Sequence, residues 1–174
     1  TYVINPTTDK VAIEVIGVKR VDGPLTSDWF AQIEVFYDNN NWVFLSSDNE
    51  NIKNWRVEKR VAGSSTFLGS GGSWAFDTRY RCKLVINAGK VSGYVDDTLI
   101  ASGTYEVNQN HKIGFAKFDG LPVSGYDLNE WAQAIFVRKY IDPEPSHGAW
   151  YAEEQSYGPQ SITLTEALGL VDTY

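Results

Sequence analysis

Apolar and polar residues alternate along most of this chain with a period of two, the spacing at which the side chains of an extended strand point to opposite faces. Residues 54–61 show the pattern most clearly. One side of that segment carries Trp55, Val57 and Val61 with Lys59, and the other carries Asn54, Arg56, Glu58 and Arg60. No window keeps the 3.6-residue apolar spacing of a helix over three turns. The pattern predicts β-strands, and for residues 54–61 a strand with one face in solvent.

Further segments predict strands for the same reason: 11–20, 30–37, 42–46, 80–87, 91–95, 98–102, 112–118 and 132–141. Asn, Asp and Gly occupy the short connections at 38–41, 87–90 and 96–97, which favours hairpins and antiparallel pairing. Two glycine-containing stretches, 69–73 and 118–122, predict longer loops. The expected fold class is all-β, an antiparallel two-sheet jelly-roll sandwich.

Pro143 and Pro145 end the last long predicted strand, because proline cannot donate a hydrogen bond to a sheet. We therefore expect a jelly-roll domain over residues 1–145 and a C-terminal extension over residues 146–174. Alternating apolar residues in the extension predict a strand that is added to its own sheet or donated to a neighbouring copy. These residues are Ile162, Leu164, Leu168 and Leu170.

The composition is that of a globular domain, because 43% of the 174 residues are hydrophobic and 21% are charged. A net charge of -7 makes a phosphate backbone an unfavourable partner, so we expect no nucleic-acid binding. No run approaches the roughly 20 apolar residues of a membrane span, so we expect no membrane insertion. The chain contains no methionine, and we therefore expect a processed or excised piece.

Cysteine and histidine are too sparse for a thiol or imidazole metal cluster. Cys82 is the only cysteine, and it shares the parity of Leu84 and Ile86, which predicts an inert buried thiol. The two histidines, His111 and His147, are expected in surface or capping positions.

Several stretches resemble the concanavalin A-like lectin/glucanase superfamily in its laminin-G-like form. They are residues 79–86, 89–101 and 112–115, with 131–145 similar to the closing strand of those domains. The resemblance spans residues 29–145 and implies a two-sheet jelly roll, a fold that hosts lectins, hydrolases and structural modules. In addition, residues 162–174 resemble the Thr/Leu-rich repeats of surface and fibre proteins.

Catalytic motifs are absent from the sequence. Hydrolases of this superfamily carry an ExDxE pattern, and the nearest fragments, 48–50 and 142–144, lack its first glutamate. A GxSxG motif is also missing. We therefore expect no catalytic residues and a protein that is not an enzyme.

Exposed aromatic residues beside polar loops are typical of sugar-binding faces. The candidates are Trp42, Asn40, Trp74, Trp150 and Tyr151. The alternative for each tryptophan is a place in the core, a role that Trp55 and Trp131 fit best by parity.

Loop oxygens make calcium the expected metal, if one is bound. The candidate ligands are Asp38, Asn40, Asp48, Asp96 and Asp97. For the last two the alternative is a tight turn that needs no ion.

Two functions follow from these features. The first is a structural or adhesive subunit of a filament, tube or fibre, assembled by strand addition and located outside the cell, at its surface or in a virion. The alternative is a carbohydrate-binding module of a larger secreted protein. The first predicts a homo-oligomer or self-assembly, and the second predicts glycans as partners.

Overall fold

The computed structural model describes residues 2–20, 29–48, 52–118 and 130–141 of the chain. All regular structure in this part is β. The strands are β1 (Val3–Ile4), β2 (Lys10–Arg20), β3 (Trp29–Asp38), β4 (Asn41–Ser47), β5 (Trp55–Val61), β6 (Ser64–Gly71), β7 (Arg79–Asn87), β8 (Lys90–Val95), β9 (Thr98–Thr104), β10 (His111–Phe118), β11 (Glu130–Trp131) and β12 (Ala134–Lys139).

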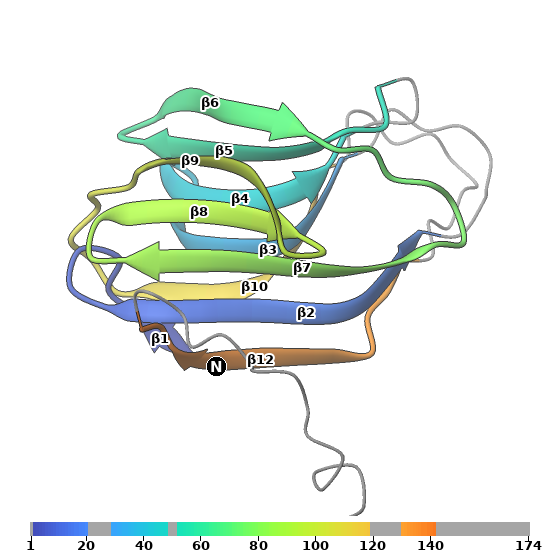
Figure 1. The fold of residues 1–174 in the computed structure, drawn as a ribbon. Helices are drawn as coiled ribbons and strands as arrows, with labels where there is room; N and C mark the ends of the chain where they lie inside the picture. Colours follow the sequence, from blue (N-terminus) through green and yellow to red (C-terminus); the bar gives the residue numbers. More distant parts are fainter. Residues whose placement is uncertain (1, 21–28, 49–51, 119–129, 142–174) are drawn as a thin grey trace, which may run out of the picture. The chain divides into compact units, whose positions relative to one another are not determined.

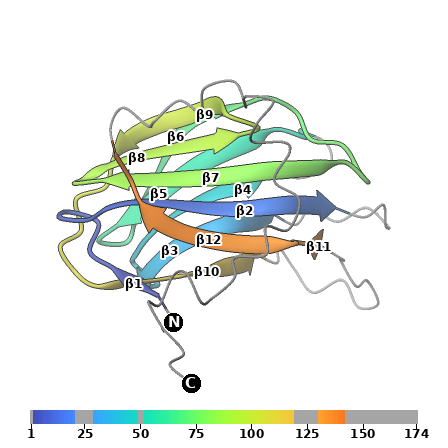
Figure 2. The same ribbon diagram turned by 60° about the horizontal axis from the view of Figure 1, so that its bottom comes forward.

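The strands form two sheets that lie one over the other (Figure 1). Sheet A has the order β1-β10-β3-β4-β5-β6, and sheet B has the order β11-β2-β7-β8-β9. Strand β12 also pairs with β2 and runs beside it along the edge of sheet B (Figure 2). Every pairing is antiparallel. The predicted all-β two-sheet sandwich, with the architecture of a jelly roll, is therefore confirmed.

The core lies between the two sheets and is built from the residues that the period-two pattern placed on one side of each strand. On β5, Trp55 and Val57 are buried in this core, as predicted. Cys82 is fully buried there as well, beside Leu84 and Ile86 on β7. Alternating side chains thus separate an inner face from an outer face on each sheet.

Tight turns connect neighbouring strands where the sequence predicted hairpins. Ala88 and Gly89 join β7 to β8 with φ values of 45° and 87°. Asp96 and Asp97 join β8 to β9 with φ values of 47° and 62°. Two consecutive residues with positive φ match the right-handed twist of the flanking strands, which explains why Asp and Gly occupy these positions.

The predicted loop at 69–73 is wrong for its first part, because residues 69–71 belong to strand β6. There Gly69, Ser70 and Gly71 pair with Val57, Arg56 and Trp55 of β5. A Cβ on Gly69 would lie 3.0 Å from the Ala101 Cβ of β9. The glycine therefore permits a close approach between the edges of the two sheets, and it does not mark a loop.

The chain divides into two compact units, residues 1–141 and 142–174. Only the first unit lies within the described residues. The predicted extension strand, with Ile162, Leu164, Leu168 and Leu170, and the candidates Trp150, Tyr151 and His147 fall outside them, as do the predicted loop from residue 119 and the side chain of Trp131. These expectations stay predictions.

Candidate functional site

The outer face of sheet A gathers aromatic and ionisable side chains from β3, β4 and β5. The register places Glu34 opposite Phe44 and Phe44 opposite Glu58, so these three form one row across the sheet. Phe36 and Trp42 lie opposite one another in the neighbouring row. We call this surface the Trp42 face.

An aromatic pair forms the centre of the Trp42 face. The Trp42 and Phe44 rings stack with their centroids 4.9 Å apart and their planes at 19°. Phe36 packs against the pair, and the three form a hydrophobic cluster separate from the core between the sheets. Trp42 is 7% exposed and Phe44 is 1% exposed, so the expectation of an exposed Trp42 is wrong, and Phe36 supplies the accessible aromatic surface of the cluster.

Ionisable side chains surround the aromatic pair. Arg56 forms ion pairs with Glu58 and with Asp48, the latter at 3.8 Å between Nη1 and Oδ2. Its guanidinium also lies 5.4 Å from the centroid of the Phe67 ring. The acid and the base on β5 thus hold each other in place.

The prediction that this side of β5 faces solvent is wrong for its middle, although Asn54 and Arg60 are partly exposed. Glu58 is only 9% exposed, and the Arg56 side chain is only 12% exposed. Charged side chains tolerate such burial because they pair with one another, and Phe44 and Phe67 stand beside Glu58 in the register. The middle of the outer face of sheet A is therefore buried, whereas Phe36, Arg60 and Lys112 toward the β3–β4 turn are partly or fully exposed.

Glu34 differs from Glu58 because it has no ionic or hydrogen-bonding partner among the described residues. Its exposed fraction is 8%, and this burial raises the pKa of its carboxyl group to about 7. A neighbouring hydroxyl, Ser46 Oγ, is buried and also lacks a hydrogen bond in the described part. Buried polar groups without partners are costly, and such groups are frequent at sites that bind ligands.

Access to the Trp42 face is greatest at the turn between β3 and β4. Trp42 pairs with Arg60, and Phe36 pairs with Lys112 of β10. Phe36 and Arg60 are partly exposed, and Lys112 is exposed. Arg60 Nε donates to the carbonyl oxygen of Gly63 at 2.9 Å, which orients the guanidinium along this end of the sheet.

The structure brings two of the predicted ligand-binding residues together at this end. Asn40 lies in the β3–β4 turn, one position from the start of the strand that carries Trp42. Its backbone nitrogen donates to Asp38 Oδ1 at 2.8 Å, and its exposed side-chain amide makes no hydrogen bond among the described residues. The amide is therefore available to a ligand at this turn.

Trp74 lies elsewhere, and its position favours the alternative role in the core. It is 3% exposed and packs inside the sandwich, where its Nε1 donates to the carbonyl oxygen of Asp48 at 3.0 Å. Its ring meets that of Phe76 edge to face. A buried ring with a satisfied indole nitrogen offers no surface for a sugar.

The predicted calcium ligands make local contacts that stabilise turns and strands. Asp38 accepts hydrogen bonds from Asn40 and Asn41 within its turn, while Asp48 stands at the opposite end of β4. Asp96 Oδ1 accepts from the backbone nitrogen of Arg81 at 2.8 Å. Within the described ranges, no three His, Cys, Asp or Glu side chains gather at metal-binding spacing. Calcium binding stays a prediction.

A separate polar cluster occupies the outer face of sheet B. Glu14 is 5% exposed and accepts hydrogen bonds from Arg81 and Arg138 on the two neighbouring strands. Burial alone would raise the pKa of Glu14, but the two guanidinium groups outweigh that effect and lower it. Asp97 pairs with Arg81 at 3.3 Å and with Lys83 at 3.7 Å. The charges of this cluster are paired with one another, and the pairs tie β12, β2 and β7 together.

One histidine is buried, contrary to the predicted surface or capping position. His111 is 0% exposed, with Nδ1 2.7 Å from the carbonyl oxygen of Gln109 and Nε2 2.8 Å from the Tyr105 hydroxyl. Because a carbonyl only accepts, Nδ1 donates and Nε2 accepts from Tyr105. Burial lowers the pKa of His111, which maintains this neutral form. The pair joins sheet A to the segment that follows β9.

Comparison with solved structures places this fold among known proteins. The carbohydrate-binding module CBM66 of Bacillus subtilis superposes with a TM-score of 0.59 at 14% identity, covering 80% of this chain and 78% of its own. The chain has a concanavalin A-like jelly-roll fold.

Other solved structures with this fold include an enzyme and an agglutinin. A xylan β-1,4-xylosidase of Bacillus halodurans matches with a TM-score of 0.61 at 11% identity over 76% of this chain, which spans only 28% of the xylosidase. A homodimeric agglutinin from chicken liver matches with a TM-score of 0.50 at 9% identity over 79% of this chain and 98% of its own. No protein-family model and no curated protein sequence matches the chain. In the described part, no helix is long and apolar enough to cross a membrane.

Proposed function

We propose that this protein is a carbohydrate-binding module and that the Trp42 face is its binding site. The observation that carries the proposal is the combination, on one face, of the partly exposed Phe36 ring, packed on the buried Trp42–Phe44 pair, with a buried acid that lacks a partner among the described residues. The partly exposed Phe36 ring suits the apolar side of a sugar, and carboxylate, amide and guanidinium groups suit its hydroxyls. Similarity of fold to a carbohydrate-binding module and an agglutinin supports the same class of function.

The ligand enters at the β3–β4 turn, where the face is most exposed. There a sugar ring packs against Phe36 and the edge of Trp42, and its hydroxyls reach Arg60 and the amide of Asn40. Glu34, two residues from Phe36 on the same side of β3, accepts a hydroxyl hydrogen bond. This contact relieves the unpartnered state of the buried carboxyl group.

A glycan array with the purified chain tests the proposal, followed by calorimetry with a retained glycan. Trp42→Ala and Arg60→Ala are each expected to weaken binding at least tenfold. Phe136→Ala is the control for loss of an aromatic ring away from the site, because Phe136 is a 51% exposed aromatic on β12 of the other sheet. Near-ultraviolet circular dichroism checks that each variant is folded. Retention of no glycan by the parent chain, or unchanged binding by folded Trp42 and Arg60 variants, would contradict the proposal.

Catalysis is a different use of the same face, and its geometry does not favour it. Glu34 and Glu58 stand on either side of Phe44 in the register, so an aromatic ring separates the two carboxyl groups. Glu58 is also engaged by Arg56. A glycosidase needs two carboxyl groups with the scissile bond between them. Incubation of a retained glycan with the protein should release no new reducing ends, and their release would establish an enzyme.

The assembly of filaments or fibres by strand addition stays a prediction, because its residues, 160–174, lie outside the described part of the chain. An extracellular, cell-surface or virion location stays a prediction with it. Deletion of residues 160–174 followed by light scattering under assembly conditions tests the first of these. An unchanged particle size would remove strand addition as a mode of assembly.

A further inference from the structure

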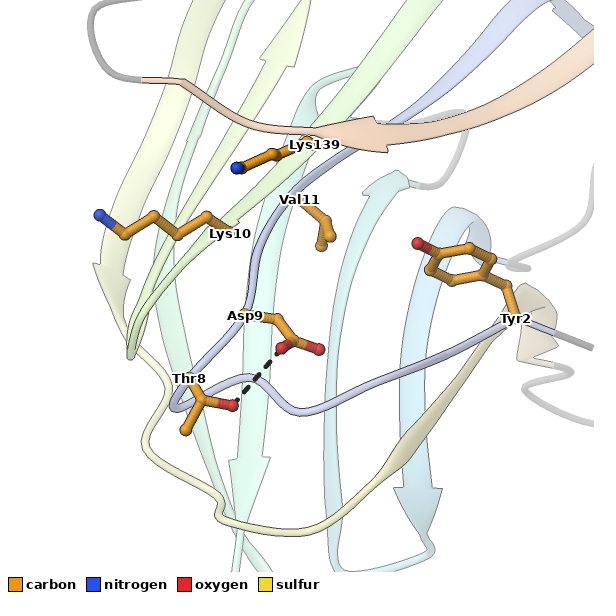
Figure 3. A pocket seen from close by; sticks show the side chains of 6 residues that line it. All are labelled: Tyr2, Thr8, Asp9, Lys10, Val11 and Lys139. Carbon is orange, nitrogen blue, oxygen red and sulfur yellow. Dashed lines mark hydrogen bonds between the residues drawn. The ribbon is translucent and has the colours of Figure 1, made fainter.

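A pocket of about 470 Å³ opens at the edge of the sandwich, away from the Trp42 face. Tyr2, which precedes β1 of sheet A, lies on one side of it, and Lys139 at the end of β12 lies on the other (Figure 3). Lys10 and Val11 come from the start of β2, between those two edges. Its volume falls in the range of sites that hold small molecules, roughly 300–1,000 Å³.

Two lysines give the pocket its charge. Lys10 and Lys139 both line the pocket, and Lys139 pairs in the register with Val11, the residue after Lys10. Figure 3 shows both side chains extending from the same side of the pocket. Neither lysine forms an ion pair within the described residues, although the whole chain carries a net charge of -7. Two lysines in the lining of one pocket favour an anionic ligand.

The rest of the lining supplies contacts that suit a sugar ring. Tyr2 is 52% exposed and lies across the pocket from the lysines. Thr8 Oγ1 hydrogen-bonds to Asp9 Oδ1 at 3.4 Å, and Asp9 Oδ2 accepts from the backbone nitrogen of Asn5 at 2.7 Å. Asp9 is thereby fixed as an acceptor at the rim. Its negative charge cancels one lysine, so a single positive charge remains for a ligand.

We propose that this pocket binds a saccharide that carries a carboxylate, a uronic acid residue. The carboxylate lies between Lys10 and Lys139, the ring packs against Tyr2, and a ring hydroxyl donates to Asp9. None of the residues that line this pocket belongs to the Trp42 face. Loss of one site therefore leaves the other intact, and failure of the proposed function does not decide this proposal.

Lysine on an edge strand also has a role that needs no ligand, because its charge discourages edge-to-edge pairing of sheets. A binding experiment separates the two roles. The probes are a glucuronic acid disaccharide, its neutral glucose counterpart and inorganic sulfate, each titrated into the ¹⁵N-labelled chain. The acidic disaccharide is expected to shift the amide signals of residues 8–11 and 139, with a dissociation constant at least tenfold lower than that of the neutral disaccharide.

Lys10→Gln and Lys139→Gln are each expected to weaken binding of the acidic disaccharide by fivefold or more. Arg79→Gln is the matched control, because Arg79 is an exposed cation at the far end of β7, roughly 26 Å along the strand from the Asn87 that pairs with Lys10. Raising the salt concentration should weaken binding further. Equal binding of the neutral disaccharide, equal binding of sulfate, or no shift at residues 8–11 and 139 would overturn the proposal.

Discussion

Glu34 makes the stability of this fold depend on pH in a direction opposite to that of a paired carboxylate. Burial raises its pKa from the ordinary value of 4.5 to about 7, so the folded state binds a proton that the unfolded state releases between these two values. The stabilising contribution is complete below pH 4.5 and is lost as the pH rises through 7. The difference corresponds to about 3 kcal/mol in the free energy of unfolding.

Glu34→Gln removes this titration while keeping the shape of the side chain. Urea unfolding of the parent and the variant is measured at pH 5 and at pH 8. The variant should gain about 2.5 kcal/mol relative to the parent between these two pH values, because pH 5 lies just above the unfolded pKa. His111 acts in the opposite direction, because burial lowers its pKa and its stabilising contribution is lost as the pH falls below the pKa of the unfolded state. This contribution is present in both proteins and cancels from the comparison.

The control for the loss of a single carboxylate is Glu106→Gln, because Glu106 is exposed. Its stability relative to the parent should change little between pH 5 and pH 8. A Glu34→Gln variant that behaves in the same way would show that the Glu34 carboxyl group is solvated or paired in solution. That result would refute the reasoning from burial and remove the unpartnered acid from the proposed site.

Two further variants test contacts in the core. Tyr105→Phe removes the hydroxyl that donates to His111 Nε2 and leaves a buried acceptor unpaired. Urea unfolding at pH 7 should show that the free energy of unfolding falls by about 1–3 kcal/mol, and an unchanged value would contradict the buried hydrogen bond. Gly93→Ala would place a Cβ 2.5 Å from Val57 Cγ2 where the two sheets meet, so its free energy of unfolding should fall by about 1–3 kcal/mol, seen as a lower melting temperature. Gly114→Ala is the control, because no atom lies within 4 Å of a Cβ at that position, and equal effects of the two variants would contradict the packing.

Most strands were predictable because their signal is local. Alternation along β5 and β7 depends on neighbours in sequence, and so does the chemistry of the Ala88–Gly89 and Asp96–Asp97 turns. Strand β6 escaped prediction because its glycines resemble a loop until the approach of β9 is known. Strand β1, which consists of Val3 and Ile4, is too short to show a period.

The candidate site was predictable only in part. Trp42 and Asn40 were identified from their place beside a turn, but Glu34 was missed, although alternation with Ile33 and Val35 places it on the outer face. What makes Glu34 unusual is burial beside Phe44, which depends on the register between β3 and β4. The pocket at Lys10 and Lys139 likewise needs the pairing of β2 with β12, from opposite ends of the domain.

The most direct measurement is a titration of the ¹⁵N-labelled chain with a neutral glycan retained on the array, observed through the indole N–H signals of the tryptophans. Binding at the outer face of sheet A should shift the signal of Trp42 and leave those of Trp55 and Trp74, which are buried in the core, nearly unchanged. Saturable binding without any movement of the Trp42 signal would contradict a sugar site on this face.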